Sequence, residues 1–188
     1  MKPIVIDHFS RRRQFIDMLR ERGAKIGVEV GTDHGQYAQQ LLEGIPDLNL
    51  TCVDPYVAYT EGNDVKTQED VNKIYEEAKS RIYKYPNSII FRDTSMNVVK
   101  DFKDNTFDFV FVDGNHSYSY VLEDITEWYK KVKPGGIIAG HDYKVDPVND
   151  YGVIEAVEKF TTDNNISPWF ILHAGGRLVD CWLIIKQP

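Results

Sequence analysis

The sequence predicts a Rossmann-like, doubly wound α/β fold, with a mostly parallel seven-stranded sheet covered by helices on both faces. Short apolar runs alternate with amphipathic segments along most of the 188 residues, and this alternation is typical of parallel sheets. Glycines or acidic residues follow several runs, at the strand ends where such sheets bind ligands. A glycine turn joins the last two runs, which predicts a C-terminal antiparallel hairpin.

Residues 1–22 are expected to form an N-terminal helical segment. The helix itself is predicted over residues 8–22, where Phe15, Ile16 and Leu19 belong to an apolar stripe. Strands and helices then alternate. The expected ranges are 25–30 (strand), 36–43 (helix), 48–53 (strand), 67–83 (helix) and 88–91 (strand).

In the second half, residues 107–112 are nearly all apolar, as a strand buried on both faces should be. The other expected elements are helices over 96–102, 119–132 and 153–160, a strand over 137–140, and hairpin strands over 169–173 and 178–185. No linker or repeat interrupts this pattern, so residues 1–188 are expected to form one domain.

Charge and composition limit the functional classes. Acidic residues outnumber basic ones, 29 to 22, and there is no dense basic stretch, so neither a nucleic-acid nor a membrane partner is expected. Without a signal peptide or an 18-residue apolar run, a cytoplasmic location is expected. Cys52 and Cys181 fall in predicted strands and are interpreted as free thiols. The oligomeric state, homo-oligomer included, stays open.

The most informative segment is the turn after the first predicted strand, Glu29-x-Gly31-x-x-x-Gly35. Glycines in such a turn let the backbone approach a ligand closely. A dinucleotide fingerprint would require its third glycine at Gln36. Asp33 inside the turn would also repel a pyrophosphate. The turn therefore indicates a cationic or polar ligand, and a strand–helix turn without any ligand is the alternative.

Asp54 directly follows the second predicted strand. A carboxylate there can accept hydrogen bonds from both hydroxyls of a ribose. The alternative is a surface Asp–Pro turn pair.

Together these features resemble the class I S-adenosylmethionine-dependent methyltransferases. The strand ending at Asp113, the turn over 132–136 and the terminal hairpin fit that family. The pair of segments Asp113-Gly114-x-His116 and Gly140-His141-Asp142 is similar to its small-molecule O-methyltransferase branch, which includes macrolide-sugar and cephalosporin-cluster relatives. The resemblance implies the strand order 3-2-1-4-5-7-6.

The resemblance also implies cofactor-binding residues. The sulfonium and ammonium groups of S-adenosylmethionine are positive, which favours an acidic rim of Glu29, Asp33 and Asp113. Gly31 and Gly35 would let the backbone approach the methionine and ribose.

Asp54 would hold the ribose, and Thr94 and Ser95 would lie near the adenine. Thr94 departs from the acidic residue common at this position. Asp93 either replaces that residue or faces solvent.

Asp113 and Asp142 follow neighbouring strands and could hold Mg²⁺, which prefers oxygen ligands. Similar enzymes use such an ion to hold the acceptor hydroxyl. Tyr143 stands where relatives have an amide or acid ligand, so the third ligand is open. The alternative is a cofactor contact for Asp113 and a loop hydrogen bond for Asp142.

His116 and His141 are the candidate general bases, because imidazole titrates near neutrality. Asn115, which replaces an Asp of some relatives, cannot serve as a base. His34 is an additional candidate for cofactor contact.

Two long segments could surround an acceptor. Residues 55–86 form either a cover over the site or a surface helix with packing tyrosines. The loop over 143–152 is a second candidate wall. The expected reaction is methylation of a small-molecule hydroxyl on a sugar, polyketide or phenol. The alternatives are N-methylation, another transfer reaction, or a cofactor-binding module without catalysis.

Overall fold

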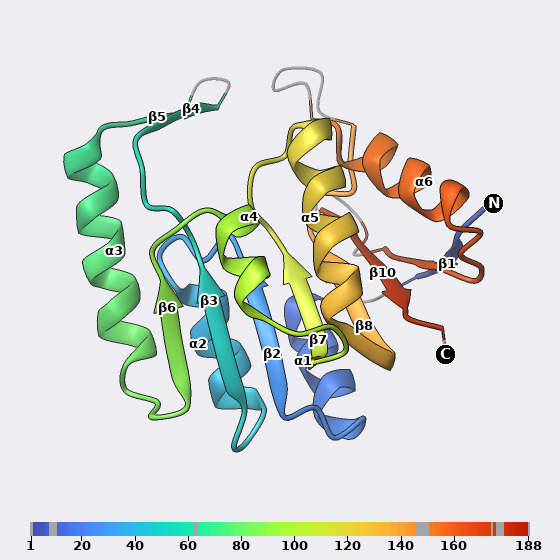
Figure 1. The fold of residues 1–188 in the computed structure, drawn as a ribbon, viewed down its shortest axis with the longest axis horizontal. Helices are drawn as coiled ribbons and strands as arrows, with labels where there is room; N and C mark the ends of the chain where they lie inside the picture. Colours follow the sequence, from blue (N-terminus) through green and yellow to red (C-terminus); the bar gives the residue numbers. More distant parts are fainter. Residues whose placement is uncertain are drawn as a thin grey trace.

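The computed structural model of the protein describes residues 2–7, 11–61, 64–145, 151–173, 175 and 179–187. A single twisted sheet lies at the centre, with helices on both faces (Figure 1). None of the helices in these ranges is both long and apolar enough to cross a membrane.

Within the described ranges, the main sheet has eight strands in the order β1-β9-β10-β8-β7-β2-β3-β6. From β6 to β9 this is the expected order 3-2-1-4-5-7-6, and β1 adds an edge strand parallel to β9. β10 runs antiparallel to both of its neighbours. The bounds are β1 Ile4–Ile6, β2 Ile26–Val30, β3 Asn49–Val53, β6 Ser88–Phe91, β7 Phe107–Val112, β8 Val132–Gly140, β9 Phe170–Leu172 and β10 Cys181–Ile185.

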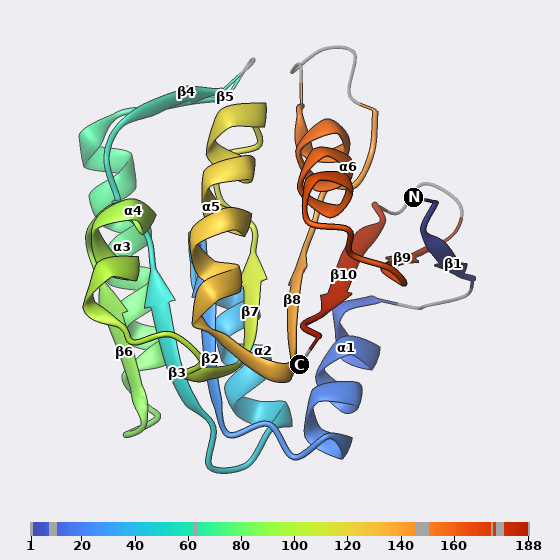
Figure 2. The same ribbon diagram turned by 45° about the vertical axis from the view of Figure 1, so that its right-hand side comes forward.

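The helices divide between the two faces, as the turned view in Figure 2 shows. The core on one face is formed with α1 (Arg11–Glu21), α2 (Gln36–Gly44) and α3 (Gln68–Ile82). The core on the other is formed with α4 (Ser95–Val98), α5 (Tyr118–Lys131) and α6 (Val153–Asp163). Two apolar layers therefore enclose the sheet, as a doubly wound fold requires.

The composition of β7 follows from its central position. Phe109 and Phe111 face one core, and the Phe111 ring packs 5.5 Å from Phe15 and 4.7 Å from Tyr37. Val110 and Val112 face the other core. Alternate side chains point to opposite faces, so a strand buried on both faces needs apolar side chains on both of them.

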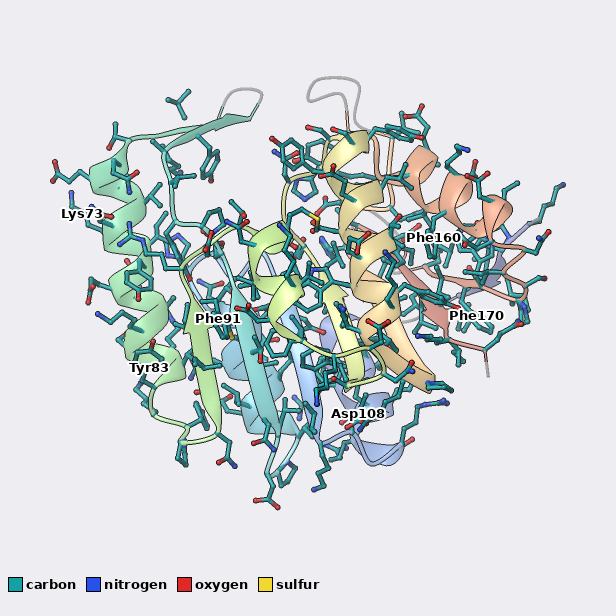
Figure 3. The ribbon with its side chains drawn as sticks, in the orientation of Figure 1. Lys73, Tyr83, Phe91, Asp108, Phe160 and Phe170 are labelled. Carbon is teal, nitrogen blue, oxygen red and sulfur yellow. The ribbon has the colours of Figure 1, made fainter. Side chains whose placement is uncertain are left out.

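Asp108 is the polar residue within β7, and it holds the amino-terminal ends of three strands together. Its Oδ2 accepts hydrogen bonds from the backbone N–H groups of Lys25 (2.8 Å) and Ile26 (2.9 Å). Its Oδ1 accepts a hydrogen bond from Lys133 Nζ at 2.7 Å. Figure 3 labels Asp108 at the bottom of the sheet. These contacts fix the amino-terminal edge of the sheet, opposite to the carboxyl edge at which α/β sheets bind ligands.

The N-terminal segment and the stretch after β3 differ from the expectations. Residues 8–10 of the predicted N-terminal helix lie outside the described residues, and α1 is observed over Arg11–Glu21. The strand β1 was not predicted, because its three residues are too few for a periodic pattern. The polar stretch after β3 contains a small hairpin, β4 (Tyr59–Glu61) and β5 (Asp64–Lys66), above the carboxyl edge of the sheet (Figure 1).

Candidate active site

A cavity of about 890 Å³ lies at the carboxyl edge of the sheet. Its walls come from the connections after β2, β3, β6 and β7, from α3 and α5, and from the segment before α6. Eight of the predicted site residues line it: Glu29, Gly31, Asp33, Asp54, Thr94, Ser95, Asp113 and His116.

The glycine turn brings two strand ends into contact. Gly31 has φ 86°, and a Cβ built on it would lie 2.1 Å from the carbonyl oxygen of Asp113. Only glycine permits this approach. Gly35, in contrast, is not among the lining residues. Its φ of 72° and the contact distance of 3.1 Å between an added Cβ and Ala78 Cα indicate a role in packing α2 against α3.

Backbone groups hold the Asp54 carboxylate in place at the end of β3. Its Oδ2 accepts a hydrogen bond from the N–H of Asp33 (2.9 Å), and its Oδ1 accepts one from the N–H of Tyr56 (2.8 Å). Burial raises the pKa of Asp54, and these two hydrogen bonds oppose the rise. Each carboxylate oxygen can accept a second hydrogen bond, so the side chain is suited to two adjacent hydroxyls.

The predicted cover segment contributes directly to the cavity wall. The ring of Tyr56 is buried against Tyr75, with centroids 4.8 Å apart, and its hydroxyl donates to the carbonyl of Asp33 at 2.9 Å. Val57 and Tyr59 are exposed and line the cavity. One tyrosine of this segment therefore packs, and another faces the open side of the cavity.

Ser95 participates in a buried network that the sequence interpretation did not include. Its hydroxyl donates a hydrogen bond to Asp124 Oδ1 and accepts one from Trp128 Nε1 at 2.7 Å. Burial raises the pKa of Asp124 to about 6, with a smaller contribution from Glu123 and opposition from the Ser95 hydrogen bond. A signal was available, because Asp124 lies in the apolar stripe of α5.

Two carboxylates and two imidazoles meet beyond β7 and β8. Asp142 Oδ2 lies 2.8 Å from His141 Nδ1 and 3.2 Å from His116 Nε2. Asp113 Oδ1 lies 3.9 Å from each of these nitrogens. Burial opposes ionisation of Asp142, but the two imidazoles outweigh it and hold its pKa well below the usual value.

This group includes a candidate metal site. Asp113, His141 and Asp142 each offer one donor atom, and the three atoms lie within 4.8 Å of one another. Metal–ligand bonds of about 2.0 to 2.6 Å allow one ion to reach all three. Tyr143 is not part of the group, since its ring packs 5.9 Å from that of Trp169 and its hydroxyl donates to Glu158 at 3.3 Å.

The two candidate bases differ in their access to the cavity. His116 lines it, and its ring stacks on Tyr151 at a centroid distance of 4.3 Å. His141 and Asp142 are not among the lining residues. His34 also lines the cavity, with Nδ1 3.0 Å from Glu77 Oε2. Of the predicted acceptor wall over 143–152, residues 146–150 lie outside the described residues.

The lining is strongly acidic. Six of the described lining residues are Asp or Glu, and none is Lys or Arg. Lys144, near the metal group, pairs with Asp142 Oδ1 at 3.3 Å. The cavity consequently has a negative potential that favours neutral or cationic ligands.

Comparison with known proteins agrees with this geometry. A family model described as a methyltransferase domain matches residues 28–143, which is more than half of the chain. The uncharacterized protein R132 of Acanthamoeba polyphaga mimivirus is 28% identical over 140 residues, which are 72% of this chain. The chain spans about three fifths of the length of that curated relative (59%).

Solved structures show the same fold at low sequence identity. The O-methyltransferase TomG from Streptomyces achromogenes, in complex with S-adenosylmethionine, aligns with a TM-score of 0.66 at 16% identity, covering 93% of this chain and 78% of TomG. An O-methyltransferase from Bacillus cereus, in complex with S-adenosylhomocysteine, aligns with 0.67 at 16%, covering 96% and 84%. The N-methyltransferase NodS from Bradyrhizobium japonicum aligns with 0.62 at 14%, covering 94% of each chain.

The matched residues include the glycine turn, Asp54, Asp113 and the His141–Asp142 pair, so the comparison and the cavity concern the same part of the molecule. The chain therefore belongs to the methyltransferase-domain family and has the Rossmann-like fold of the S-adenosylmethionine-dependent methyltransferases.

Proposed function

We propose that this protein transfers the methyl group of S-adenosylmethionine to a hydroxyl oxygen of a small, uncharged molecule. The proposal rests on one observation: Asp54, Asp113 and His116 all line the same cavity. Asp54 would hold the ribose of the cofactor, and Asp113 and His116 would lie beside the acceptor oxygen.

The cofactor would lie along the carboxyl edge of the sheet. The ribose hydroxyls would donate to Asp54, and Gly31 would let the backbone approach the methionine part. Glu29 and Asp33 would stabilise the positive ammonium group. The sulfonium would then face Asp113, so that the methyl group points at the acceptor.

A divalent cation would be held by Asp113, His141 and Asp142, which the donor geometry fits. It would supply Lewis-acid stabilisation of the acceptor oxygen. Mg²⁺ prefers oxygen ligands, and the imidazole also makes Mn²⁺ a suitable ion.

His116 would act as the general base. It lines the cavity, Asp142 orients it at 3.2 Å, and Tyr151 holds its ring by stacking. An imidazole in this position can take the hydroxyl proton as the carbon–oxygen bond forms and the carbon–sulfur bond breaks. His141, the alternative base, is instead assigned to the metal group.

The charge of the cavity supports an uncharged acceptor. The described lining residues include six carboxylates and no Lys or Arg, so an anionic acceptor would be repelled, whereas a neutral sugar, polyketide or phenol would not. The exposed Tyr59 and Tyr120 offer ring faces to such a molecule. We further propose that residues 1–188 act as one domain and that residues 55–86 cover the cofactor.

A second candidate is N-methylation, favoured by the same acidic lining, since a protonated amine would be attracted to it. It differs from the main proposal in the acceptor atom and not in the cofactor site.

Two measurements test the proposal. Calorimetric titration should detect S-adenosylhomocysteine binding, and Asp54→Asn should weaken it about 10- to 100-fold, because a charge-assisted acceptor is lost. Asp101→Asn, the same change at an exposed residue outside the cavity, should leave binding unaltered. Absence of binding at millimolar ligand would refute the proposal.

Acceptor chemistry is tested with three related catechols: 3,4-dihydroxybenzyl alcohol, dopamine and 3,4-dihydroxyphenylacetate. Methyl transfer from labelled cofactor should favour the neutral alcohol and disfavour the carboxylate. Product analysis by mass spectrometry would identify O-methyl or N-methyl dopamine, and exclusive N-methylation would favour the second candidate.

A further inference from the structure

Asp124 is a carboxylate that folding alone does not explain. It lies on the apolar face of α5, among the buried Val121, Ile125 and Trp128, and is 6% exposed. In the described part of the chain, Ser95 is the hydrogen-bond partner of its side chain. Burying a carboxylate with one hydrogen bond is costly, so its presence indicates a role in ligand binding.

The network around Asp124 orients the carboxylate toward the cavity. Trp128 Nε1 donates to Ser95 Oγ at 2.7 Å, and the Ser95 hydroxyl in turn donates to Oδ1. The second oxygen, Oδ2, lies on the side of Gly114, where a Cβ built on that glycine would be 3.9 Å away. Asp124, Ser95 and Gly114 all line the cavity. Oδ2 is therefore available as an acceptor at the cavity wall.

The position of Asp124 indicates which part of a cofactor it would meet. This step rests on the proposed function. With the ribose on Asp54 and the sulfonium toward Asp113, the base extends in the remaining direction, to the wall formed by Thr94, Ser95 and Met96 after β6. Asp124 lines the cavity beside that wall, through its contact with Ser95, and the Met96 thioether is suited to pack against a flat ring.

We propose that Asp124 selects adenine, by accepting a hydrogen bond from the 6-amino group of the base at Oδ2. An ionised carboxylate can only accept hydrogen bonds. It pairs with the amino donor of adenine and opposes the oxo acceptor that hypoxanthine carries at the same position. Asp124 is thus a specificity-determining residue for the cofactor.

The selection should depend on pH. Burial raises the pKa of Asp124 to about 6, Glu123 on the same helix adds to the rise, and the Ser95 hydrogen bond opposes it. At pH 8 the carboxylate is ionised and rejects an oxo group. At pH 5 it is mostly protonated, and its O–H can donate to that oxo group, so the preference should shrink.

The experiment compares S-adenosylhomocysteine with its 6-oxo (hypoxanthine) analogue by calorimetric titration. At pH 8 the wild-type protein should bind the adenine compound at least about tenfold more tightly. Asp124→Asn keeps the shape and adds a donor, so it should reduce the ratio to within about threefold. Asp101→Asn is the matched control, since it makes the same change at an exposed residue and should keep the wild-type ratio.

The outcomes separate this inference from the proposed function. An unchanged ratio in Asp124→Asn, with the adenine compound still bound, would overturn the role of Asp124 and leave the cofactor assignment intact. Failure of the wild type to bind either compound would overturn both. If Asp124→Asn does not fold, the wild-type protein provides the test. Its ratio of affinities for the adenine and hypoxanthine compounds should be smaller at pH 5 than at pH 8, and a ratio that does not change with pH would contradict the inference.

Discussion

Replacement of Asp124 by Asn should stabilise the free protein, and increasingly so at higher pH. The folded-state pKa is about 6, raised mainly by burial from a reference value of 3.8. Because the pKa of Asp124 is higher in the folded state than in the unfolded state, ionisation of this carboxyl lowers the free energy of unfolding. This penalty is absent below about pH 3.8, grows as the pH rises, and is complete above about pH 6. Asn carries no charge and avoids the penalty.

The magnitude follows from the two pKa values. At pH 5 the unfolded carboxyl is ionised and the folded one is mostly protonated, which gives a penalty of about 2 kcal/mol. At pH 8 both are ionised, and the full difference of about 2 pKa units corresponds to about 3 kcal/mol. The advantage of Asn over Asp should thus increase by about 1 kcal/mol between pH 5 and pH 8.

Urea unfolding followed by tryptophan fluorescence measures this difference, since Trp128 is buried beside the network. Asp101→Asn provides the control, because its side chain stays in water. An Asp124→Asn difference that is constant over this pH range, or that changes in the opposite direction, would refute the argument that Asp124 is buried at a cost.

Three further predictions concern the strand ends. Gly31→Ala should abolish S-adenosylhomocysteine binding and lower the melting temperature, because its Cβ would lie 2.1 Å from the Asp113 carbonyl; unaltered calorimetric binding would contradict the close approach. Asp108→Asn should lower the free energy of unfolding by about 1–3 kcal/mol at pH 7, as measured by urea unfolding. Burial raises the pKa of Asp108, but its hydrogen bonds and Lys133 outweigh burial and lower it, so this loss should fade as the pH falls through the lowered pKa. His141→Ala should remove the rise in melting temperature that Mn²⁺ produces, with His116→Ala retaining it; the reverse result would exchange their assigned roles.

Much of the fold was determined by local sequence pattern. The alternation of apolar runs with amphipathic segments predicted the parallel sheet and the positions of Asp54 and Asp113 at its carboxyl edge. The end of a strand can be predicted locally, because it is the point in the sequence where the apolar run stops. The three-residue strand β1 was missed, since its pairing with β9 depends on a distant segment.

Only the tertiary structure decided what each side chain at that edge contacts. Gly35, predicted to meet the cofactor, packs α2 against α3, whereas Gly31 meets the Asp113 carbonyl. His141 joins the two predicted metal-binding carboxylates, and Asp124 turns a carboxylate from the apolar stripe of α5 toward the cavity. The physical reason is that these contacts join residues far apart in the chain, and their distances are set by the packing of strands and helices, which no local period encodes.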